Sequence, residues 1–143
     1  MHMVVIVDGG RKKVSSSDAH LRVTKSPHFF GRVNRARMRM DRLLPALESS
    51  DWRSAYDICT EEFEDMHELF HTSDPPFRYR TPDSDHVVQD CADLWARHRD
   101  GPIVTMDAGP NVHLLFRRDQ QALLSKLHEQ YSRSHTVISS EAA

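Results

Sequence analysis

Apolar and polar positions alternate most clearly between Gly101 and Arg117, in the segment GPIVTMDAGPNVHLLFR. β-Branched and large apolar residues fill positions 103–106 and 112–116, which is typical of two strands. Positions 108–111 between them read Ala-Gly-Pro-Asn, a run of strand-breaking residues. Glycine opens backbone conformations that other residues resist, proline fixes φ, and asparagine tolerates the left-handed region. The pattern therefore predicts a β-hairpin with a tight and rigid turn.

Asp107 is predicted to end the first strand of this hairpin, facing the gap beside Gly109. A carboxylate on a stiff support, where a ligand can approach bare backbone, is often a catalytic or substrate-positioning acid. The alternative interpretation is that Asp107 only caps the turn through its own backbone. The local pattern leaves both interpretations open.

Apolar residues three and four positions apart predict helices in the rest of the chain. Serine or threonine followed by proline signals a helix start, and glycine or proline signals a helix end. On these signals the helices begin at Ser26, Asp51 and Thr81, and they end soon after Pro45, near Ser73 and at Gly101; a last helix contains Leu124, Leu127 and Tyr131.

Two further strands complete the predicted sheet. The β-branched run Val4–Val7 is stopped by Asp-Gly-Gly at positions 8–10, and Thr136–Ile138 is a short final strand. Strands and helices in this order predict an α+β sandwich, with the helices packed on one face of a mainly antiparallel sheet. We expect one domain, residues 4–139, followed by a tail, residues 140–143.

The helix predicted to begin at Ser26 has two contrasting faces. Its apolar stripe is formed by Phe29, Val33, Ala36, Met40, Leu43 and Leu47, and its other side carries Arg32, Arg35, Arg39 and Arg42. A basic helical stripe can bind nucleic acid. Here no aromatic residues are interleaved with the arginines, so we expect no nucleic acid partner. The arginines should form a solvated face or dock on an acidic neighbour.

Length and charge change this picture little. The chain has 143 residues, enough for one core, with a net charge of −2 and 28% charged residues. Such a chain has no global field that would recruit nucleic acid or an anionic membrane. It also has no run of 18 apolar residues, so we expect no membrane partner. Residues 1–3 are too short for a signal peptide, and we interpret them as a cloning remnant before Val4, which would make the chain a truncation.

The two cysteines favour a reducing compartment. Cys59 and Cys91 each lie in an apolar helical stripe. Free cysteine in such a position behaves as a small buried hydrophobic residue. We therefore predict no disulfide.

A cluster of lysines and hydroxyls follows the predicted turn at Gly9 and Gly10, in the segment RKKVSSS. Lysine supplies charge and serine supplies short hydrogen bonds, so Lys13, Ser15 and Ser16 could hold a phosphate group. A solvated loop without a ligand would have the same composition.

The segment from His67 to His71 reads H-E-x-x-H, the signature of zinc proteases. Histidines four apart share a helix face and can bind one Zn²⁺, while Glu68 between them would activate water. We discount this match because the chain contains ten histidines and because the helix is predicted to end within about three residues of His71. No downstream segment supplies an evident third ligand, so we assign no metal site.

Several of these segments together resemble one family. TMDAGPNVHLLF resembles the Asp-Ala-Gly-Pro-Asn segment of the diphosphomevalonate decarboxylases, members of the GHMP kinase superfamily. KKVSSSDAH and TKSPHF resemble the family's Val-Ser-Ser segment and the Thr-Ser-Pro that opens its next helix. MHELFHTSDPPFRY resembles its Met-His turn followed by Pro-Pro-Phe. These motifs stand in the family's order and cover nearly the whole chain.

The resemblance implies a fold and a set of site residues. The fold would be the ferredoxin-like C-terminal domain of GHMP kinases. Asp107 would stand beside the tertiary hydroxyl of 5-diphosphomevalonate, orienting it or accepting its proton, and the neighbouring Gly109, Pro110 and Asn111 would hold Asp107 in place. Ser16, with Ser15 and Lys13, would contact the diphosphate of the substrate.

The resemblance further implies ATP and Mg²⁺, bound mainly by an ATP-binding N-terminal part whose Gly-Leu-Ala-Ser-Ser-type phosphate loop this sequence does not contain. It implies a cytoplasmic enzyme of isoprenoid biosynthesis that decarboxylates its substrate to isopentenyl diphosphate and that could be a homodimer. Two alternatives remain. One is a binding or interaction module that kept the fold and lost turnover. The other is a small zinc hydrolase using His67, Glu68 and His71.

Overall fold

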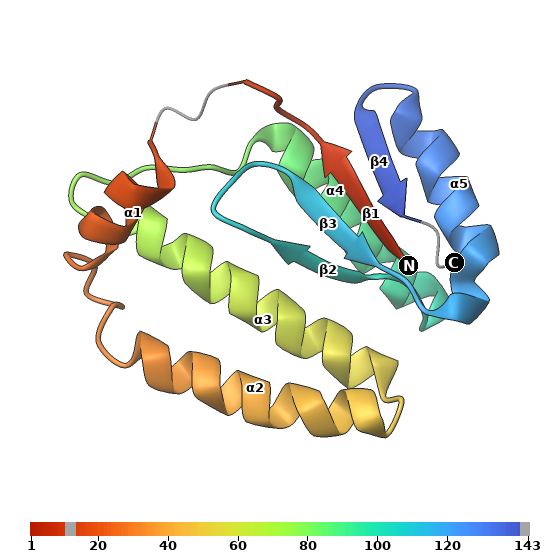
Figure 1. Ribbon diagram of the computed structural model, residues 1–143, viewed down its shortest axis with the longest axis horizontal. Coiled ribbons are helices and arrows are strands. Elements are labelled where there is room, and N and C mark those ends of the chain that lie inside the picture. The colour runs from red at the N-terminus through yellow and green to blue at the C-terminus, as the bar shows by residue number, and fades with distance from the viewer. Residues whose placement is uncertain (11–13, 141–143) are drawn as a thin grey trace. The chain divides into compact units, whose positions relative to one another are not determined.

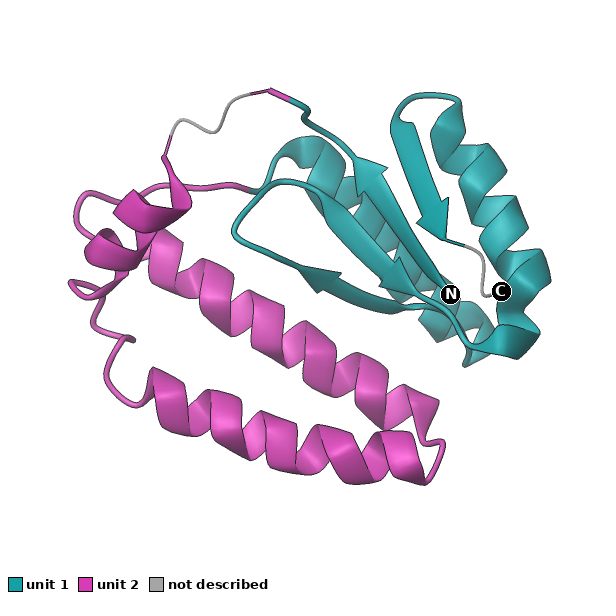
Figure 2. Cartoon of the chain, in the orientation of Figure 1, with its two compact units in different colours: residues 1–9, 80–143 teal, residues 10–79 magenta. Residues whose placement is uncertain are grey.

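The structure is a computed structural model that describes residues 1–10 and 14–140 (Figure 1). The chain forms two compact units (Figure 2). Residues 1–9 and 80–143 form the first unit, and residues 10–79 form the second. The second unit is therefore inserted into the sequence of the first.

The first unit contains a four-stranded antiparallel sheet of order β2-β3-β1-β4 (Figure 1). Its strands are β1 (His2–Ile6), β2 (Ile103–Met106), β3 (Val112–Leu115) and β4 (Thr136–Ser140). The predicted hairpin is present as β2 and β3, in which Met106 pairs with Val112 across the turn. The α+β prediction is confirmed.

Two helices pack against this sheet, α4 (Pro82–His98) against β3 and α5 (Gln121–Ser132) against β1 and β4. A short 3₁₀ helix, η1 (Arg118–Gln120), leads into α5. Directly paired strand residues share a face of the sheet, and the buried face consists of Met3, Val5, Val104, Met106, Val112 and Leu114. The order β-α-β-β-α-β, with the second unit inserted after β1, is the ferredoxin-like arrangement.

Strand β1 begins earlier than the sequence pattern indicated. It starts at His2 instead of Val4, and Met3 is fully buried and pairs with Leu114. At the other end of the sheet, β4 continues to Ser140, beyond the predicted Ile138. His2 and Met3 pair with β3 on one side and with the end of β4 on the other. The pattern of apolar residues alone placed the start of β1 and the end of β4 too far inside the chain.

The sequence predicts that Gly101 ends α4, and the structure shows that it does not. The helix stops at His98, and Arg99 takes the left-handed conformation (φ 53°) that closes it. Gly101 instead lies against Trp95, where a Cβ atom would come within 2.9 Å of the indole nitrogen. That nitrogen donates a hydrogen bond of 2.9 Å to the carbonyl oxygen of Pro102. Glycine is thus required here by close packing and not by a helix end.

Helix α4 also buries the thiol of Cys91, which is fully covered. Burial raises the pKa of this thiol to about 12, because the thiolate would lose its hydration there. Cys59 is partly buried, and burial raises its thiol pKa as well. Both cysteines are free, in agreement with the prediction.

The second unit consists of α1 (Ser16–Val23), α2 (Arg32–Glu48) and α3 (Trp52–His71). The sequence did not predict α1, and it placed the start of α2 too early, at Ser26. The side chain of Ser26 instead accepts from the amide of His28 and is 2.7 Å from the hydroxyl of Thr72, so it builds a turn. Helix α2 begins after Gly31, whose φ of 80° is in the left-handed region that glycine favours.

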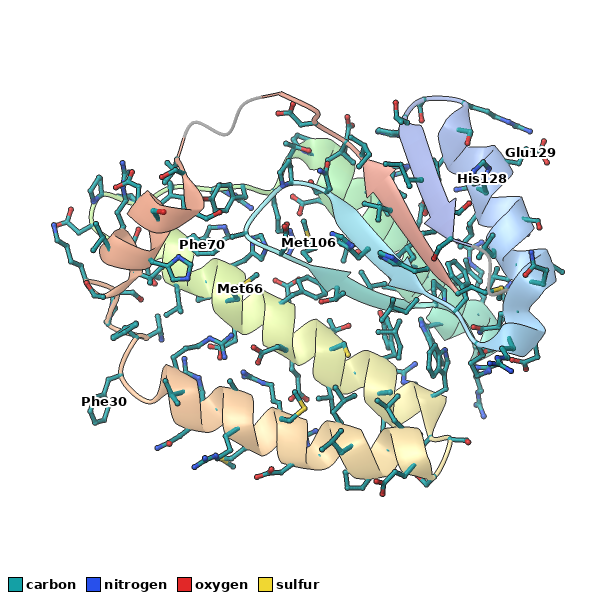
Figure 3. All side chains as sticks on the ribbon, in the orientation of Figure 1. Phe30, Met66, Phe70, Met106, His128 and Glu129 are labelled. Atoms are coloured by element: carbon teal, nitrogen blue, oxygen red, sulfur yellow. The ribbon has the colours of Figure 1, made fainter. Side chains whose placement is uncertain are left out.

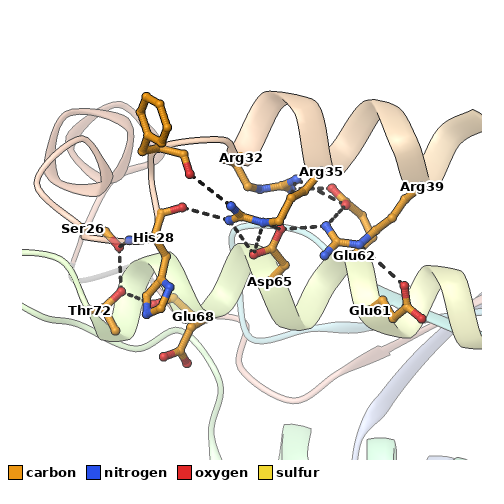
Figure 4. A network of polar contacts seen from close by, with 11 residues as sticks. Ser26, His28, Arg32, Arg35, Arg39, Glu61, Glu62, Asp65, Glu68 and Thr72 are labelled. Atoms are coloured by element: carbon orange, nitrogen blue, oxygen red, sulfur yellow. Dashed lines mark hydrogen bonds and ion pairs between the residues drawn. The ribbon is translucent and has the colours of Figure 1, made fainter.

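The basic face of α2 docks on acidic residues of α3, which was one of the two predicted outcomes (Figure 4). Arg35 and Arg39 contact Asp65 at 2.8 and 2.7 Å, and Arg39 also contacts Glu62 at 3.0 Å. Arg32 pairs with Glu62 as well. Burial alone would raise the pKa of Asp65, but its hydrogen bonds from Arg35 and Arg39 hold that pKa below the usual value. Val33, Met40 and Leu47 of the predicted apolar stripe are consequently exposed, whereas Ala36 and Leu43 are partly covered.

No helix within residues 1–10 and 14–140 is both long enough and apolar enough to cross a lipid bilayer.

Candidate active site

The turn that carries Asp107 combines an exposed carboxylate with buried residues. Asp107 directly follows β2 and is exposed, whereas Gly109 and Pro110 are buried. The turn therefore presents Asp107 at the surface of the first unit, as a group that must meet a ligand would need to be.

The first turn of α4 fixes this turn from one side. The buried hydroxyl of Ser84 donates a hydrogen bond of 2.6 Å to the carbonyl oxygen of Pro110. Ser84 is itself held by a capping box, in which its amide donates to the hydroxyl of Thr81 and its hydroxyl accepts from the amide of Thr81. The residues that start α4 are thus the same residues that anchor the turn.

The end of β1 fixes the turn from a second side. The side-chain oxygen of Asn111 accepts hydrogen bonds from the backbone amides of Val7 and Asp8, at 3.1 and 3.4 Å. Two adjacent amides that leave the sheet at Ile6 are satisfied in this way. Asn111 therefore joins the hairpin turn to the segment that follows β1.

The rigidity of the turn has a different origin from the one predicted. In the described residues, positive φ occurs at Gly31, Ser50 and Arg99, so neither Gly109 nor Asn111 uses the left-handed region. The turn is held by side chains from α4 and from the turn itself, which bond to backbone groups across the unit. The left-handed conformations that the Gly, Pro and Asn pattern indicated are therefore absent from this turn.

Ser15 and Ser16 stand at the start of α1 and not in a loop. Ser15 is the N-cap, and its hydroxyl accepts a hydrogen bond of 3.1 Å from the amide of Asp18. Ser16 is the first residue of the helix, and both serines are exposed. The free amides and the dipole at a helix N-terminus favour an anion. Lys13, the third predicted contact, lies outside the described residues.

Tyr79 positions the segment before α1. Its buried hydroxyl donates a hydrogen bond of 2.9 Å to the carbonyl oxygen of Val14. The ring of Tyr79 packs edge-on against Phe70 of α3, with 5.2 Å between ring centroids. Phe70 is labelled in Figure 3. Sequence reasoning had singled out neither Tyr79 nor Ser84. Only the Thr-Pro-x-Ser pattern of a capped helix start gave a local signal for Ser84.

The first histidine of the H-E-x-x-H segment is a packing residue. The ring of His67 is fully buried and lies edge-on between Phe63 and Phe70, with centroids 6.4 and 5.3 Å away. The side chain of Glu68 is 51% exposed and lies 3.7 Å from the ring of His71. Within the part of the chain that the structure describes, no group of three or more His, Cys, Asp or Glu side chains is placed to hold a metal ion.

The fold is that of a ferredoxin-like α+β domain, and comparisons with known proteins agree with this fold. Residues 2–142 match the model of the family described as the mevalonate 5-diphosphate decarboxylase C-terminal domain. The chain belongs to this family. A search of curated protein sequences found no match.

Solved structures give the same result. A mevalonate diphosphate decarboxylase from Legionella pneumophila is 40% identical with a TM-score of 0.90, over 96% of this chain and 44% of that one. The enzyme from Trypanosoma brucei is 25% identical with a TM-score of 0.80, over 90% and 35%. A structure of MDDEF in complex with MVAPP, AMPPCP and magnesium is 26% identical with a TM-score of 0.74, over 95% and 42%. The chain thus spans less than half the length of these relatives.

Proposed function

We propose that this chain forms the substrate-binding and catalytic-acid part of an ATP-dependent decarboxylase that converts 5-diphosphomevalonate to isopentenyl diphosphate. The observation that carries the proposal is the family match over residues 2–142, combined with an exposed Asp107 on a clamped turn. The 40% identity to the Legionella enzyme supports the same chemistry.

Asp107 is the catalytic residue of this proposal. It orients the tertiary hydroxyl of the substrate or accepts its proton while ATP phosphorylates that oxygen, before phosphate and CO₂ leave. A general base must lie within hydrogen-bond reach of the proton that it takes, and small displacements are costly in rate. The bonds of Pro110 to Ser84 and of Asn111 to the end of β1 limit such displacements. Gly109 forms part of the compact, buried side of the turn.

Ser16, Ser15 and Lys13 bind the diphosphate of the substrate. Ser16 can offer both its hydroxyl and its backbone amide, since the first amides of α1 have no partner within the helix. Ser15 already accepts from Asp18, so its hydroxyl retains its own proton to donate to a phosphate oxygen. Lys13 would add a positive charge close by in the sequence.

ATP and Mg²⁺ complete the reaction. Phosphoryl transfer needs positioning and charge neutralisation more than covalent help from the protein. We assign no Mg²⁺ ligand to this chain and expect the ion to be held mainly through the ATP phosphates, as Mg²⁺ commonly is. The partner that binds ATP would be the N-terminal part of the family's fold, and we expect the assembled enzyme to act in the cytoplasm.

The test is to combine this chain with the N-terminal part of the Legionella relative and measure ATP-dependent release of CO₂ from 5-diphosphomevalonate. Asp107→Asn should abolish release, because the amide cannot accept the proton, whereas Asp74→Asn, at an exposed acid outside the turn, should leave it unchanged. Full activity of the Asp107→Asn protein would refute the assigned role. Binding of the substrate without any turnover would instead support the alternative of a non-catalytic module.

A further inference from the structure

The segment that follows α3 folds back against the end of that helix. Residues 74–79 read Asp-Pro-Pro-Phe-Arg-Tyr, and the proposed reaction assigns no role to them. The amide of Phe77 donates a hydrogen bond of 3.1 Å to the carbonyl oxygen of Phe70, and the hydroxyl of Ser73 donates to the same oxygen at 2.9 Å. Helix α1 packs beside the same end of α3 (Figure 1). The segment therefore carries Tyr79 to the start of α1.

Two aromatic rings fix the side chain of Tyr79. Its ring meets Phe70 and Phe77 edge to face, with centroids 5.2 and 5.4 Å away and interplanar angles of 88° and 84°. Edge-to-face contact is a favoured geometry for aromatic pairs. Phe70 and Phe77 also contact each other, at 5.1 Å. Tyr79 is only 7% exposed, so its hydroxyl cannot shift without disturbing this cluster.

The hydroxyl of Tyr79 lies against two successive carbonyl oxygens. It donates at 2.9 Å to the oxygen of Val14, and the oxygen of Ser15 is 3.4 Å away. The Ser15 carbonyl also accepts from the amide of Ala19 at 2.9 Å, which is the first hydrogen bond of α1. The two peptide units on either side of Ser15 are thus held by their oxygens.

These contacts set the direction of two backbone amides. In a trans peptide unit the carbonyl oxygen and the amide hydrogen lie on opposite sides. The Val14 oxygen is turned to the buried hydroxyl, so the amide of Ser15 points away from it. The Ser15 oxygen points along α1 toward Ala19, so the amide of Ser16 points out of the helix start. Neither amide has an acceptor among residues 1–10 and 14–140. Amides in this position are suited to an anion.

The same aromatic cluster helps to keep the start of α1 favourable for an anion. Asp18, in the first turn of α1, would oppose a second negative charge. Its carboxylate pairs with the guanidinium of Arg22 at 2.7 Å. That guanidinium lies over the ring of Phe77, 5.6 Å from its centroid, in a cation–π contact. The charge of Asp18 is therefore offset by an arginine that rests on the cluster.

We propose that Tyr79 is a positioning residue for diphosphate binding. Its hydroxyl holds the carbonyls of Val14 and Ser15, and it thereby aims the amides of Ser15 and Ser16 at the diphosphate of the substrate. Tyr79 acts through the backbone and does not touch the substrate itself. The inference rests on the proposed function, in which both serines bind this diphosphate.

The first test titrates the chain with inorganic pyrophosphate and follows its backbone amides by NMR. The amide resonances of Ser15 and Ser16 should shift. Tyr79→Phe keeps the ring and removes the hydroxyl, so it should weaken the affinity for pyrophosphate about tenfold, the loss expected for one misdirected hydrogen bond to a charged group. Tyr131→Phe is the matched control. Tyr131 is 3% exposed and donates to Asp90 at 3.3 Å in the first unit, so its variant should bind pyrophosphate unchanged.

The second test separates positioning from a structural role. With the N-terminal part of the Legionella relative added, Tyr79→Phe should raise the KM for 5-diphosphomevalonate about tenfold and leave kcat within about twofold. The turn that carries Asp107 belongs to the first unit and keeps its own contacts. A variant that only lost folded protein would show a lower kcat at an unchanged KM, and that result would overturn the proposal.

The pyrophosphate titration is decisive without turnover. Equal affinities of Tyr79→Phe and the unchanged chain would overturn the proposal, and so would equal weakening by Tyr131→Phe. Amides of Ser15 and Ser16 that do not respond in the unchanged chain would also overturn it, because there would be no contact to position. Binding that depends on Tyr79, in a protein that releases no CO₂, would refute the proposed reaction and leave the role of Tyr79 standing.

Discussion

Ser84 and Pro110 are joined by a buried hydrogen bond of 2.6 Å, which links the first turn of α4 to the turn that presents Asp107. The carbonyl oxygen of Pro110 is enclosed, so it has no water to replace this donor. The relationship makes the geometry of the candidate site depend on a helix start 26 residues earlier in the sequence.

Ser84→Ala should therefore cost stability and loosen the turn. Leaving a buried acceptor without its donor costs about 1–3 kcal/mol. Ser54→Ala is the matched control, since Ser54 holds the same third position of α3 and bonds its N-cap Asp51, but does so at the surface. In urea unfolding, Ser84→Ala should lower the free energy of unfolding by the amount given above, and Ser54→Ala by under about 1 kcal/mol. Equal losses would mean that the contact to Pro110 contributes nothing beyond capping.

Asn111→Ala should release the segment after β1 from the hairpin. The amides of Val7 and Asp8 would lose the oxygen that accepts from them, and hydrogen exchange at both should become faster. Asn111→Asp keeps an acceptor in the same place and should retain most of the protection. If the alanine and aspartate variants exchange alike, the side-chain oxygen does not hold this segment.

Gly101→Ala should destabilise the first unit by about 1–3 kcal/mol, because the added methyl group overlaps a fixed indole ring. The new Cβ atom would lie 2.9 Å from Nε1 of Trp95, which cannot move without losing its bond to Pro102. Gly9→Ala serves as the control, since its nearest neighbour would be 4.0 Å away. The free energy of unfolding and Trp fluorescence measure both. An unchanged Gly101→Ala protein would argue against the tight packing.

Asp65→Asn should make the second unit less stable, and the loss should depend on pH. The arginines of α2 hold the folded pKa of Asp65 below its unfolded value, so its charge favours folding. That contribution is complete above about pH 4 and disappears as the pH falls through the folded pKa.

We expect Asp65→Asn to cost about 2 kcal/mol at pH 7 and to converge with the unchanged chain in acid. Asp57→Asn, which removes only an exposed pair with Arg53 on the same helix, should have little effect at any pH. A pH-independent difference between Asp65→Asn and the parent would show that the ion pairs are not its cause.

The elements with strong apolar periodicity could be predicted from the sequence, and α1 could not. The hairpin and the helices α3, α4 and α5 follow from their patterns. Helix α1 buries only Ala19 and Val23, so its eight residues carry almost no periodic signal. Its cap, Ser15, was interpreted as part of a phosphate-binding loop because a cap and an anion contact call for the same hydroxyl. The prediction of where α2 begins was wrong because Ser26 bonds to Thr72, a partner 46 residues away, and does not cap the helix.

The orientation of α2 depended on tertiary contacts as well. Its four arginines and its apolar stripe each could have faced the rest of the unit, and the acidic residues of α3 decided between them. For the candidate site, the family motif located Asp107 and its turn. It did not reveal Ser84 or Tyr79, because their bonds to Pro110 and Val14 join segments that are distant in sequence.

The enclosed thiol of Cys91 can serve as a probe of local unfolding in the first unit. Alkylating reagents react with thiolates, and a sulfur that is both covered and protonated is silent to them. The rate at which Cys91 is alkylated would report how often α4 separates from its neighbours. Any ligand that steadies the first unit could then be recognised by slower modification of a single atom.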